Sequence, residues 1–333
     1  MTTDQPEPDA VLSEAQAAVY DRQLRVWGLE VQNRLSAGKI LVAGGDGIAA
    51  EVAKNLVLAG VGLVALLDDT PVQHRSPCNF LVAADAPPSS TVAAAAADTL
   101  QQMNPLIRVT AQAGGEGGDL GDSQVEPYDL VFASCSSFAE MEALEGVCSR
   151  LGKKLFACML RGPAAFTFVN LGPQFSFCEK TADGKKGEPR SFDYPSLSSA
   201  MSTPLSSLTR QSHPMYPVVR VARMFEEKQG RPPGPSDAAE LQALADGLAA
   251  SEGTAPSKAW HTPRADLVAS WAVSKGAELA PVAAVVGGVV ANHVIRAMSC
   301  VGAPINNCFF YTLFDVSNGG VGTEERMPFA AKA

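Results

Sequence analysis

One apolar run that ends in a glycine-rich turn constrains the fold of this chain more than any other feature. Residues 39–43 (KILVA) have the length and composition of a buried strand, and the turn Gly44-Gly45-Asp46-Gly47 follows directly. A helical pattern then covers about residues 48–59, and a second apolar run at 62–67 ends at Asp68. A strand, a glycine turn, a helix and a second strand make a βαβ unit, whose crossover is almost always right-handed. The chain is therefore expected to contain a parallel sheet.

The same alternation continues along the chain. Helical patterns cover 91–103 and 138–150, strand patterns cover 107–111, 128–133 and 154–159, and 166–170 alternates like a half-exposed antiparallel strand. Helical patterns return over 216–229, 237–250, 264–276 and 281–300, before a final strand at 307–314. These patterns predict an α/β fold with a doubly wound, Rossmann-like, mostly parallel sheet and antiparallel edge strands. We expect one domain made of 13–178 and 215–330, a flexible N-terminus at 1–12, and an irregular insertion or partly disordered linker at 179–214.

The first helix is expected to be long and amphipathic. Ser13 followed by Gln16 is a capping-box pattern that begins a helix. An apolar stripe then recurs at helical spacing until Ala37-Gly38, formed by Tyr20, Leu24, Trp27, Val31 and Leu35. At 3.6 residues per turn, Arg22 points away from this stripe.

The glycine turn admits two interpretations. Gly45 to Ala50 fits G-x-G-x-x-A, and Asp68 lies about twenty residues further on, which is the pattern of a dinucleotide site. The alternative is a tight turn that needs positive φ and close packing between helix and sheet. Asp46 inside the turn argues against phosphate binding, because its carboxylate repels an anion. We interpret Gly44, Gly45, Gly47 and Asp68 as a remnant loop that holds no cofactor.

Composition excludes several classes of function. The net charge of −9 leaves no basic footprint for nucleic acid. The seven cysteines form no C-x-x-C pair, so no metal site is expected, and we expect reduced, mostly buried thiols. The apolar run at 279–295 is interrupted by proline, glycine, asparagine and histidine, which favours a buried core helix over a membrane span.

The run YDRQLRVWG at 20–28 is a specific motif. It resembles the start of the adenylation domain in the activating enzymes of ubiquitin-like proteins, a ThiF-like family. Further resemblance lies at 29–35, 39–47, 53–62, 103–105, 166–172, 277–290 and 306–311. The resemblance implies the ThiF/activating-enzyme adenylation fold, and a reaction in which the C-terminal carboxylate of a small protein attacks the α-phosphate of ATP–Mg²⁺.

One stretch departs from the family pattern. Active halves have Ser-Asn-Leu-Asn-Arg-Gln after the strand-end acid, whereas Pro77 and Cys78 stand in the matching region here. The chain also lacks the Pro-x-Cys-Thr context of the family's catalytic cysteine. It therefore resembles the inactive half, which in the SUMO and NEDD8 systems is a separate, smaller, non-catalytic subunit, and it fits the SUMO branch better.

The resemblance implies partners and roles. The expected partner is the catalytic subunit of a SUMO-activating enzyme, and ATP and Mg²⁺ are expected to bind to that subunit and not to this chain. SUMO is a further expected partner, and the SUMO-conjugating enzyme an indirect one. No binding to nucleic acid or to a membrane is expected. A location in the nucleus, and also the cytoplasm, follows from that pathway. Arg22 is expected to reach the ATP phosphates in the partner's pocket, with Arg25 supporting the same site or lining the interface. Tyr20 and Trp27 are expected at the interface or in the core.

Four alternatives stay open. The chain is a NEDD8-type regulatory subunit, an NAD(P)-binding Rossmann oxidoreductase, a self-sufficient homodimeric adenylating enzyme, or a scaffold in which Arg22 has no catalytic effect.

Overall fold

The structure is a computed structural model of the chain, and it describes residues 13–114, 120–180, 186–209, 212–252, 262–313, 321–325 and 327. The N-terminus predicted to be flexible, residues 1–12, lies outside the described residues.

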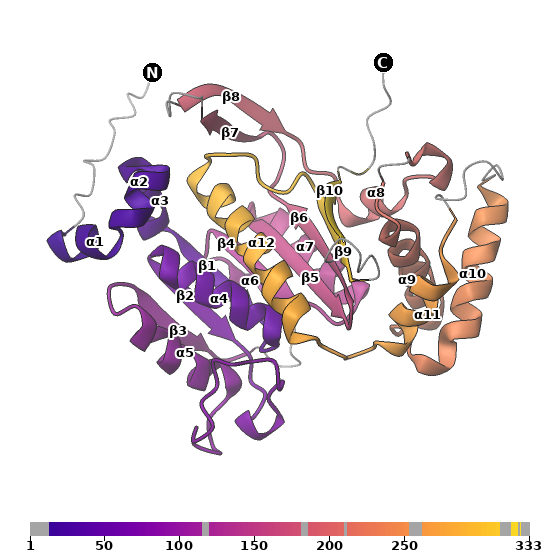
Figure 1. Ribbon diagram of the computed structural model, residues 1–333, viewed down its shortest axis with the longest axis horizontal. Helices are drawn as coiled ribbons and strands as arrows, with labels where there is room; N and C mark the ends of the chain where they lie inside the picture. Colours follow the sequence, from indigo (N-terminus) through magenta and orange to yellow (C-terminus); the bar gives the residue numbers. More distant parts are fainter. Residues whose placement is uncertain are drawn as a thin grey trace.

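One eight-stranded sheet organises the molecule, in the order β10-β9-β6-β5-β4-β1-β2-β3 (Figure 1). Five neighbouring strands are parallel: β3 (Arg108–Gln112), β2 (Leu63–Leu67), β1 (Lys39–Ala43), β4 (Leu130–Ser134) and β5 (Lys154–Arg161). The other three are antiparallel to their neighbours: β6 (Ala164–Asn170), β9 (Cys308–Thr312) and β10 (Val321–Glu325). The predicted doubly wound sheet with antiparallel strands at one edge is confirmed.

Helices cover both faces of the sheet, and strand residues alternate between them. Ile40 and Val42 pack into one core, whereas Leu41 and Ala43 pack into the other. The first core lies under α3 (Leu29–Ala37), α4 (Gly47–Ala59), α5 (Val92–Met103) and α12 (Ala280–Ser299). The second lies under α6 (Asp122–Val125), α7 (Phe138–Leu151), α8 (Leu197–Met201), α9 (Met215–Gln229), α10 (Ala238–Ser251) and α11 (Ala265–Val273).

Strand β6 is buried on both faces. The sequence pattern predicted a half-exposed strand, but every residue from Ala164 to Val169 is buried. The prediction was wrong because β6 is an interior strand between β5 and β9, with a core on each side. Its antiparallel direction is as predicted.

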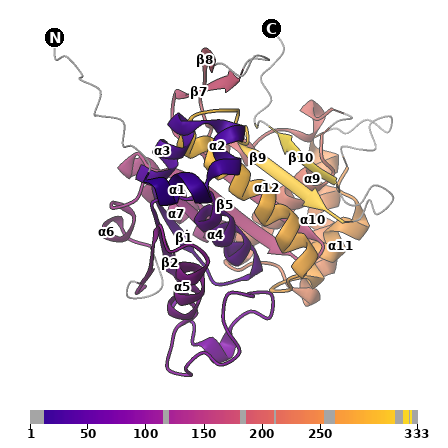
Figure 2. The ribbon, with the colours of Figure 1, turned by 60° about the vertical axis from the view of Figure 1, so that its left-hand side comes forward.

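Helix α12 has the length and apolar composition of a membrane span, yet 61% of its most apolar window is buried within the protein. It lies beside α4 over the sheet (Figures 1 and 2). Gly287 permits this close approach, since a Cβ there would lie 2.6 Å from the Cβ of Glu51 on α4. The burial agrees with the prediction of a core helix.

The N-terminal segment is divided into three helices, not one. These are α1 (Glu14–Val19), with the predicted capping box at Ser13 and Gln16, then α2 (Asp21–Trp27) and α3. Gly28 interrupts the helix between α2 and α3 with φ 86° and ψ 170°, a conformation open to little but glycine. The apolar stripe continues at helical spacing across this break, so spacing alone could not reveal it.

The stretch predicted to be irregular contains regular structure. Strands β7 (Phe175–Lys180) and β8 (Lys186–Phe192) form an antiparallel hairpin, and α8 and the short 3₁₀ helix η2 (Leu205–Ser207) follow. Aromatic contacts stabilise it: the ring centroids of Phe177 and Phe192 lie 5.1 Å apart, and Tyr194 packs edge-on against Phe175. The prediction was wrong because sparse periodicity hides strands that depend on cross-strand aromatic pairs.

Candidate functional site

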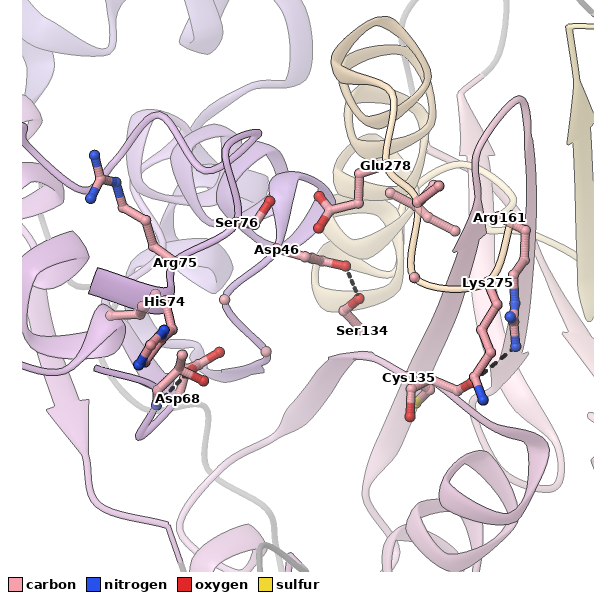
Figure 3. A pocket seen from close by; sticks show the side chains of 18 of the residues that line it. Asp46, Asp68, His74, Arg75, Ser76, Ser134, Cys135, Arg161, Lys275 and Glu278 are labelled. Carbon is pink, nitrogen blue, oxygen red and sulfur yellow. Dashed lines mark hydrogen bonds between the residues drawn. The ribbon is translucent and has the colours of Figure 1, made fainter. Parts of the chain in front are cut away.

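A cavity of about 620 Å³ opens at the carboxyl ends of β1 and β4 (Figure 3). β1 connects through α4 to β2 on one side, while β4 lies on its other side, so this is the point at which the strand order reverses. Ligands of doubly wound proteins bind at such a point. Gly44, Gly45 and Asp68 of the predicted remnant loop line the cavity together with Asp46, whereas Gly47 is not among its lining residues.

The glycines of the loop are required by close packing. Gly44 has φ 105°, and a Cβ on Gly45 would lie 2.3 Å from Oδ2 of Asp68. The side-chain amide of Asn79 donates to the carbonyl of Gly45 at 2.9 Å, which fixes the loop from the other side. The loop therefore has a structural reason for its glycines whether or not a nucleotide binds.

Two carboxylates of the chain itself occupy the N-terminal end of α4. Asp46 is the N-cap: its Oδ1 accepts from the backbone N–H of Ala49 at 3.0 Å, and its Oδ2 accepts from the hydroxyl of Ser134. Glu278 accepts from the backbone N–H of Gly47 at 2.8 Å. Free N–H groups at a helix N-terminus form the usual binding site for a phosphate. Here two N–H groups of the first turn, those of Gly47 and Ala49, donate to carboxylates of the chain instead.

The electrostatics of the loop also oppose an anion. The pKa of Asp46 is raised to about 6: burial is the largest cause, the hydrogen bonds from Ser134 and Ala49 oppose it, and the nearby carboxylates of Glu278 and Asp68 add to the rise. Asp46 and its acidic neighbours already disfavour one another's negative charge, and a polyphosphate at this position would add to the repulsion.

The segment that departs from the family pattern packs directly on the loop. A Cβ on Gly47 would lie 2.7 Å from the Cβ of Cys78. The backbone N–H of Cys78 donates to the hydroxyl of Ser76 at 3.0 Å, which holds the turn. The segment that contains Pro77 and Cys78 thus lies close against the start of α4.

Basic side chains line the two flanks of the cavity. Figure 3 shows Asp46, Ser134 and Glu278 between His74 and Arg75 on one side and Arg161 and Lys275 on the other. Arg161 is buried, donates to the carbonyl of Ser136 at 3.2 Å and lies over the ring of Trp271. Burial lowers its pKa, against the opposing effect of Glu226. The cavity thus has basic flanks, but acidic groups where phosphates would meet the helix.

Arg22 and Arg25 lie away from this cavity. They are on α2, which contacts the C-terminal end of α4, whereas the cavity lies at the N-terminal end of α4. The 13 residues of α4 separate the two ends by roughly 20 Å. Arg22 is exposed and has no hydrogen-bond or ion-pair partner among the described residues. The neighbouring acids are engaged elsewhere: Asp21 pairs with Arg25 at 2.9 Å, and Glu30 pairs with Arg34 and Lys186. Arg22 is therefore free to meet a group from outside the chain.

Tyr20 and Trp27 differ in exposure. Tyr20 is 1% exposed, and its hydroxyl accepts from the side-chain amide of Asn104 at 2.9 Å, so it is a core residue of this chain and not an interface residue. The apolar stripe could not distinguish these two roles. Trp27 is partly buried and lines a second cavity, of about 720 Å³, between α2, α4 and α12.

Sequence reasoning missed Glu278 and Ser134 as parts of the site. Glu278 is far along the chain from Gly47, and only the fold brings its carboxylate to α4. Glu278 lies in the segment 277–290, which resembles the family, but that resemblance did not indicate what its side chain does.

Comparisons with known proteins identify the family of the chain. The ThiF family profile matches residues 20–328. SUMO-activating enzyme subunit 1B-1 of Arabidopsis thaliana is 35% identical over 320 residues, covering 92% of this chain and 95% of the relative. SUMO-activating enzyme subunit 1 of Xenopus laevis is 31% identical over 345 residues, covering 91% of this chain and 94% of the relative. Among solved structures, a crystal structure of E. coli MccB with succinimide matches with a TM-score of 0.53 and 13% identity, covering 94% of this chain and 73% of that one. This last likeness concerns the fold alone.

Proposed function

The chain belongs to the ThiF family, and from that premise we propose that it is the smaller subunit of a heterodimeric SUMO-activating enzyme. Its relatives over more than nine-tenths of its length are named SUMO-activating enzyme subunit 1. The proposed role is to pair with the catalytic subunit during ATP-dependent adenylation of the C-terminus of SUMO.

The chain is proposed to be the inactive adenylation half. The observation on which this rests is the start of α4, where Asp46 and Glu278 accept the backbone N–H groups that would bind phosphate. The residues present do not fit a nucleotide phosphate at this position, because two carboxylates already occupy the donors. ATP and Mg²⁺ are therefore assigned to the partner's pocket, and the NAD(P) alternative meets the same obstacle.

Arg22 is proposed to act in the partner's pocket. A planar guanidinium binds phosphate oxygens through two parallel hydrogen bonds and neutralises the charge that develops as pyrophosphate leaves. Its exposure and its lack of a partner among the described residues support this role. Arg25 pairs with Asp21 and is assigned a supporting position, and Trp27 is assigned to the interface.

The test is ATP–pyrophosphate exchange in the presence of SUMO. We expect no exchange with this chain alone, exchange with the catalytic subunit added, and a rate at least roughly tenfold lower when the added chain bears Arg22→Ala. Heterodimer formation, followed by size-exclusion chromatography, should be unchanged: among the described residues Arg22 makes no hydrogen bond or ion pair, so its loss should leave the fold of this chain intact, and its proposed contact is with the ATP phosphates.

Each contrary outcome has a distinct meaning. Exchange by the isolated chain overturns the inactive half in favour of a self-sufficient adenylating enzyme. Exchange that Arg22→Ala leaves unchanged reduces the chain to a scaffold. Activity with NEDD8 in place of SUMO identifies the sister pathway. The location in the nucleus, and also the cytoplasm, stays a prediction from the pathway, to be checked by imaging of the tagged chain.

A further inference from the structure

Three consecutive carbonyl groups at the C-terminal end of α4 each accept from a side-chain amide. The carbonyl of Val57 accepts from Asn104 at 2.8 Å, that of Leu58 from Gln23 at 2.9 Å, and that of Ala59 from Gln32 at 3.0 Å. The last carbonyls of a helix have no partner of their own within it. We call these three amides the amide clamp.

The amide clamp connects α4 to the helix that bears Arg22. Gln23 belongs to α2 itself. The other two amides hold its ends: Asn104 donates to the hydroxyl of Tyr20, just before α2, and Gln32 accepts from the indole N–H of Trp27, its last residue. Every member of the amide clamp therefore contacts both α4 and either α2 or a residue next to it.

Besides the hydrogen bonds of the amide clamp, few contacts hold helix α2 in place. None of its residues is buried, and Val26 is 70% exposed. A helix of two turns cannot form stably alone and depends on tertiary contacts. Apolar contacts hold its two ends, where Tyr20 is buried and Trp27 packs partly buried against the first core. Along the rest of α2 apolar burial is small, so these hydrogen bonds contribute to the direction in which it faces.

A glycine makes room for the amide clamp. Gly60, the C-cap of α4, has φ 84°, and a Cβ there would lie 2.7 Å from Nε2 of Gln32 and 2.7 Å from the ring of Tyr20. The close approach is therefore possible only with glycine at this position.

We propose that Gln23, Gln32 and Asn104 are positioning residues that hold α2 in the orientation in which Arg22 reaches the partner's phosphate site. This rests on the proposed function, in which Arg22 acts in trans. The amide clamp contacts neither ATP nor the partner's reacting groups. It acts through Arg22, by reducing the number of directions in which that side chain is presented.

Gln23 offers the cleanest test because its amide is imperfectly satisfied. Its nitrogen donates to Leu58, but its buried oxygen has no partner among the described residues. Gln23→Met removes one hydrogen bond and one unsatisfied acceptor together, so the change in stability is expected to be small. A kinetic effect is then separable from unfolding.

The experiment is a double-mutant cycle in ATP–pyrophosphate exchange by the assembled heterodimer. We expect Gln23→Met to lower the exchange rate roughly three- to tenfold when Arg22 is present, and to have no further effect on Arg22→Ala. Gln23→Lys, which restores a donor at the helix C-terminus, should recover most of the rate. Gln124→Met, on α6, is the control: Gln124 is also partly buried and its amide also donates to a backbone carbonyl, that of Ala113, while its oxygen accepts from the N–H of Gly121, so a general effect of losing such hydrogen bonds would appear there at least as strongly.

The outcomes separate this proposal from the proposed function. An equal loss in the Arg22 and the Arg22→Ala backgrounds overturns positioning through Arg22. So does an unchanged rate for Gln23→Met when Arg22→Ala slows exchange. If Arg22→Ala itself has no effect, the proposed function of Arg22 fails, and the positioning role fails with it.

Discussion

Asp46 is a buried carboxyl group held by hydrogen bonds at the N-terminus of α4, and its environment favours the neutral form. Burial is the main cause of its raised pKa of about 6, with the charges of Glu278 and Asp68 acting in the same direction. The ordinary value of an aspartate in the unfolded chain is about 4. Between these values the folded state binds more protons than the unfolded state, so the stability from this group falls as pH rises.

A stability measurement against pH checks this at a single residue. From pH 4.5 to 6.5 we expect the wild-type chain to lose roughly 2 kcal/mol of unfolding free energy relative to Asp46→Asn, and the difference to stay constant above that range. The asparagine keeps an acceptor for the N–H of Ala49 but does not ionise in this pH range. Urea denaturation at a series of pH values gives the comparison. Parallel curves for the two proteins would contradict the assignment of the raised pKa to Asp46.

Comparison with Asp46→Asn also isolates this carboxyl from Glu325. Burial raises the pKa of Glu325 to about 7, against a hydrogen bond from the backbone of His213. That group gives both proteins the same additional loss of stability as pH rises towards 7. It therefore cancels in the difference.

At the scale of elements, Gly28 decides where α2 ends and α3 begins. Its φ of 86° with ψ of 170° is unfavourable for any other residue, although no atom blocks a Cβ there. We expect Gly28→Ala to lower the unfolding free energy by roughly 1–3 kcal/mol through backbone strain. Gly146→Ala, at an exposed position inside helix α7 with open space around the new methyl group, should instead stabilise by roughly 0.5–1 kcal/mol.

Thermal unfolding of both variants distinguishes strain from a general effect of added methyl groups. If Gly28→Ala left the melting temperature unchanged, α2 and α3 could join as one helix, as the apolar stripe predicted. The same variant should also weaken exchange in the heterodimer, because it changes the direction of α2 relative to the amide clamp.

The parallel strands were predictable from sequence, while other elements were not, for definite physical reasons. Residues 39–43 and 62–67 are continuous apolar runs because both faces of those strands are buried. The β7–β8 hairpin was missed because its strands are mostly polar and depend on contacts such as that of Phe177 with Phe192. Likewise, the loop glycines were visible in sequence, but the contact between Glu278 and Gly47 exists only once α12 packs on α4.

At the scale of the whole molecule, exposed apolar residues gather at the end of the molecule that bears α1 and α2. They are Val19 at 62%, Val26 at 70%, Leu29 at 52% and Leu58 at 44% exposure. The second cavity opens beside them, lined by Val26, Trp27 and Leu58. Such a surface is costly to leave in water and is typical of a protein interface.

A charge placed on this surface should therefore disturb assembly. We expect Val26→Asp to weaken binding to the catalytic subunit at least roughly tenfold, since burying an unpaired carboxylate at an interface is strongly unfavourable. Val273→Asp, at another exposed valine (55%) at the end of α11, should have little effect. Isothermal titration calorimetry of the two variants gives the comparison, and equal affinities would place the interface elsewhere.

The carboxylates at the start of α4 bear on how the stability of this fold depends on the concentration of ATP. A ligand stabilises a protein only to the extent that it binds the folded form, by an amount that grows with its free concentration. In this chain the groups that neutralise the helix terminus are covalently part of the polypeptide. Their effective concentration is therefore fixed by the fold. Under the proposed function, in which this chain holds no nucleotide of its own, we expect its folded population not to vary with the supply of nucleotide, so that the subunit stays available for assembly when ATP is scarce.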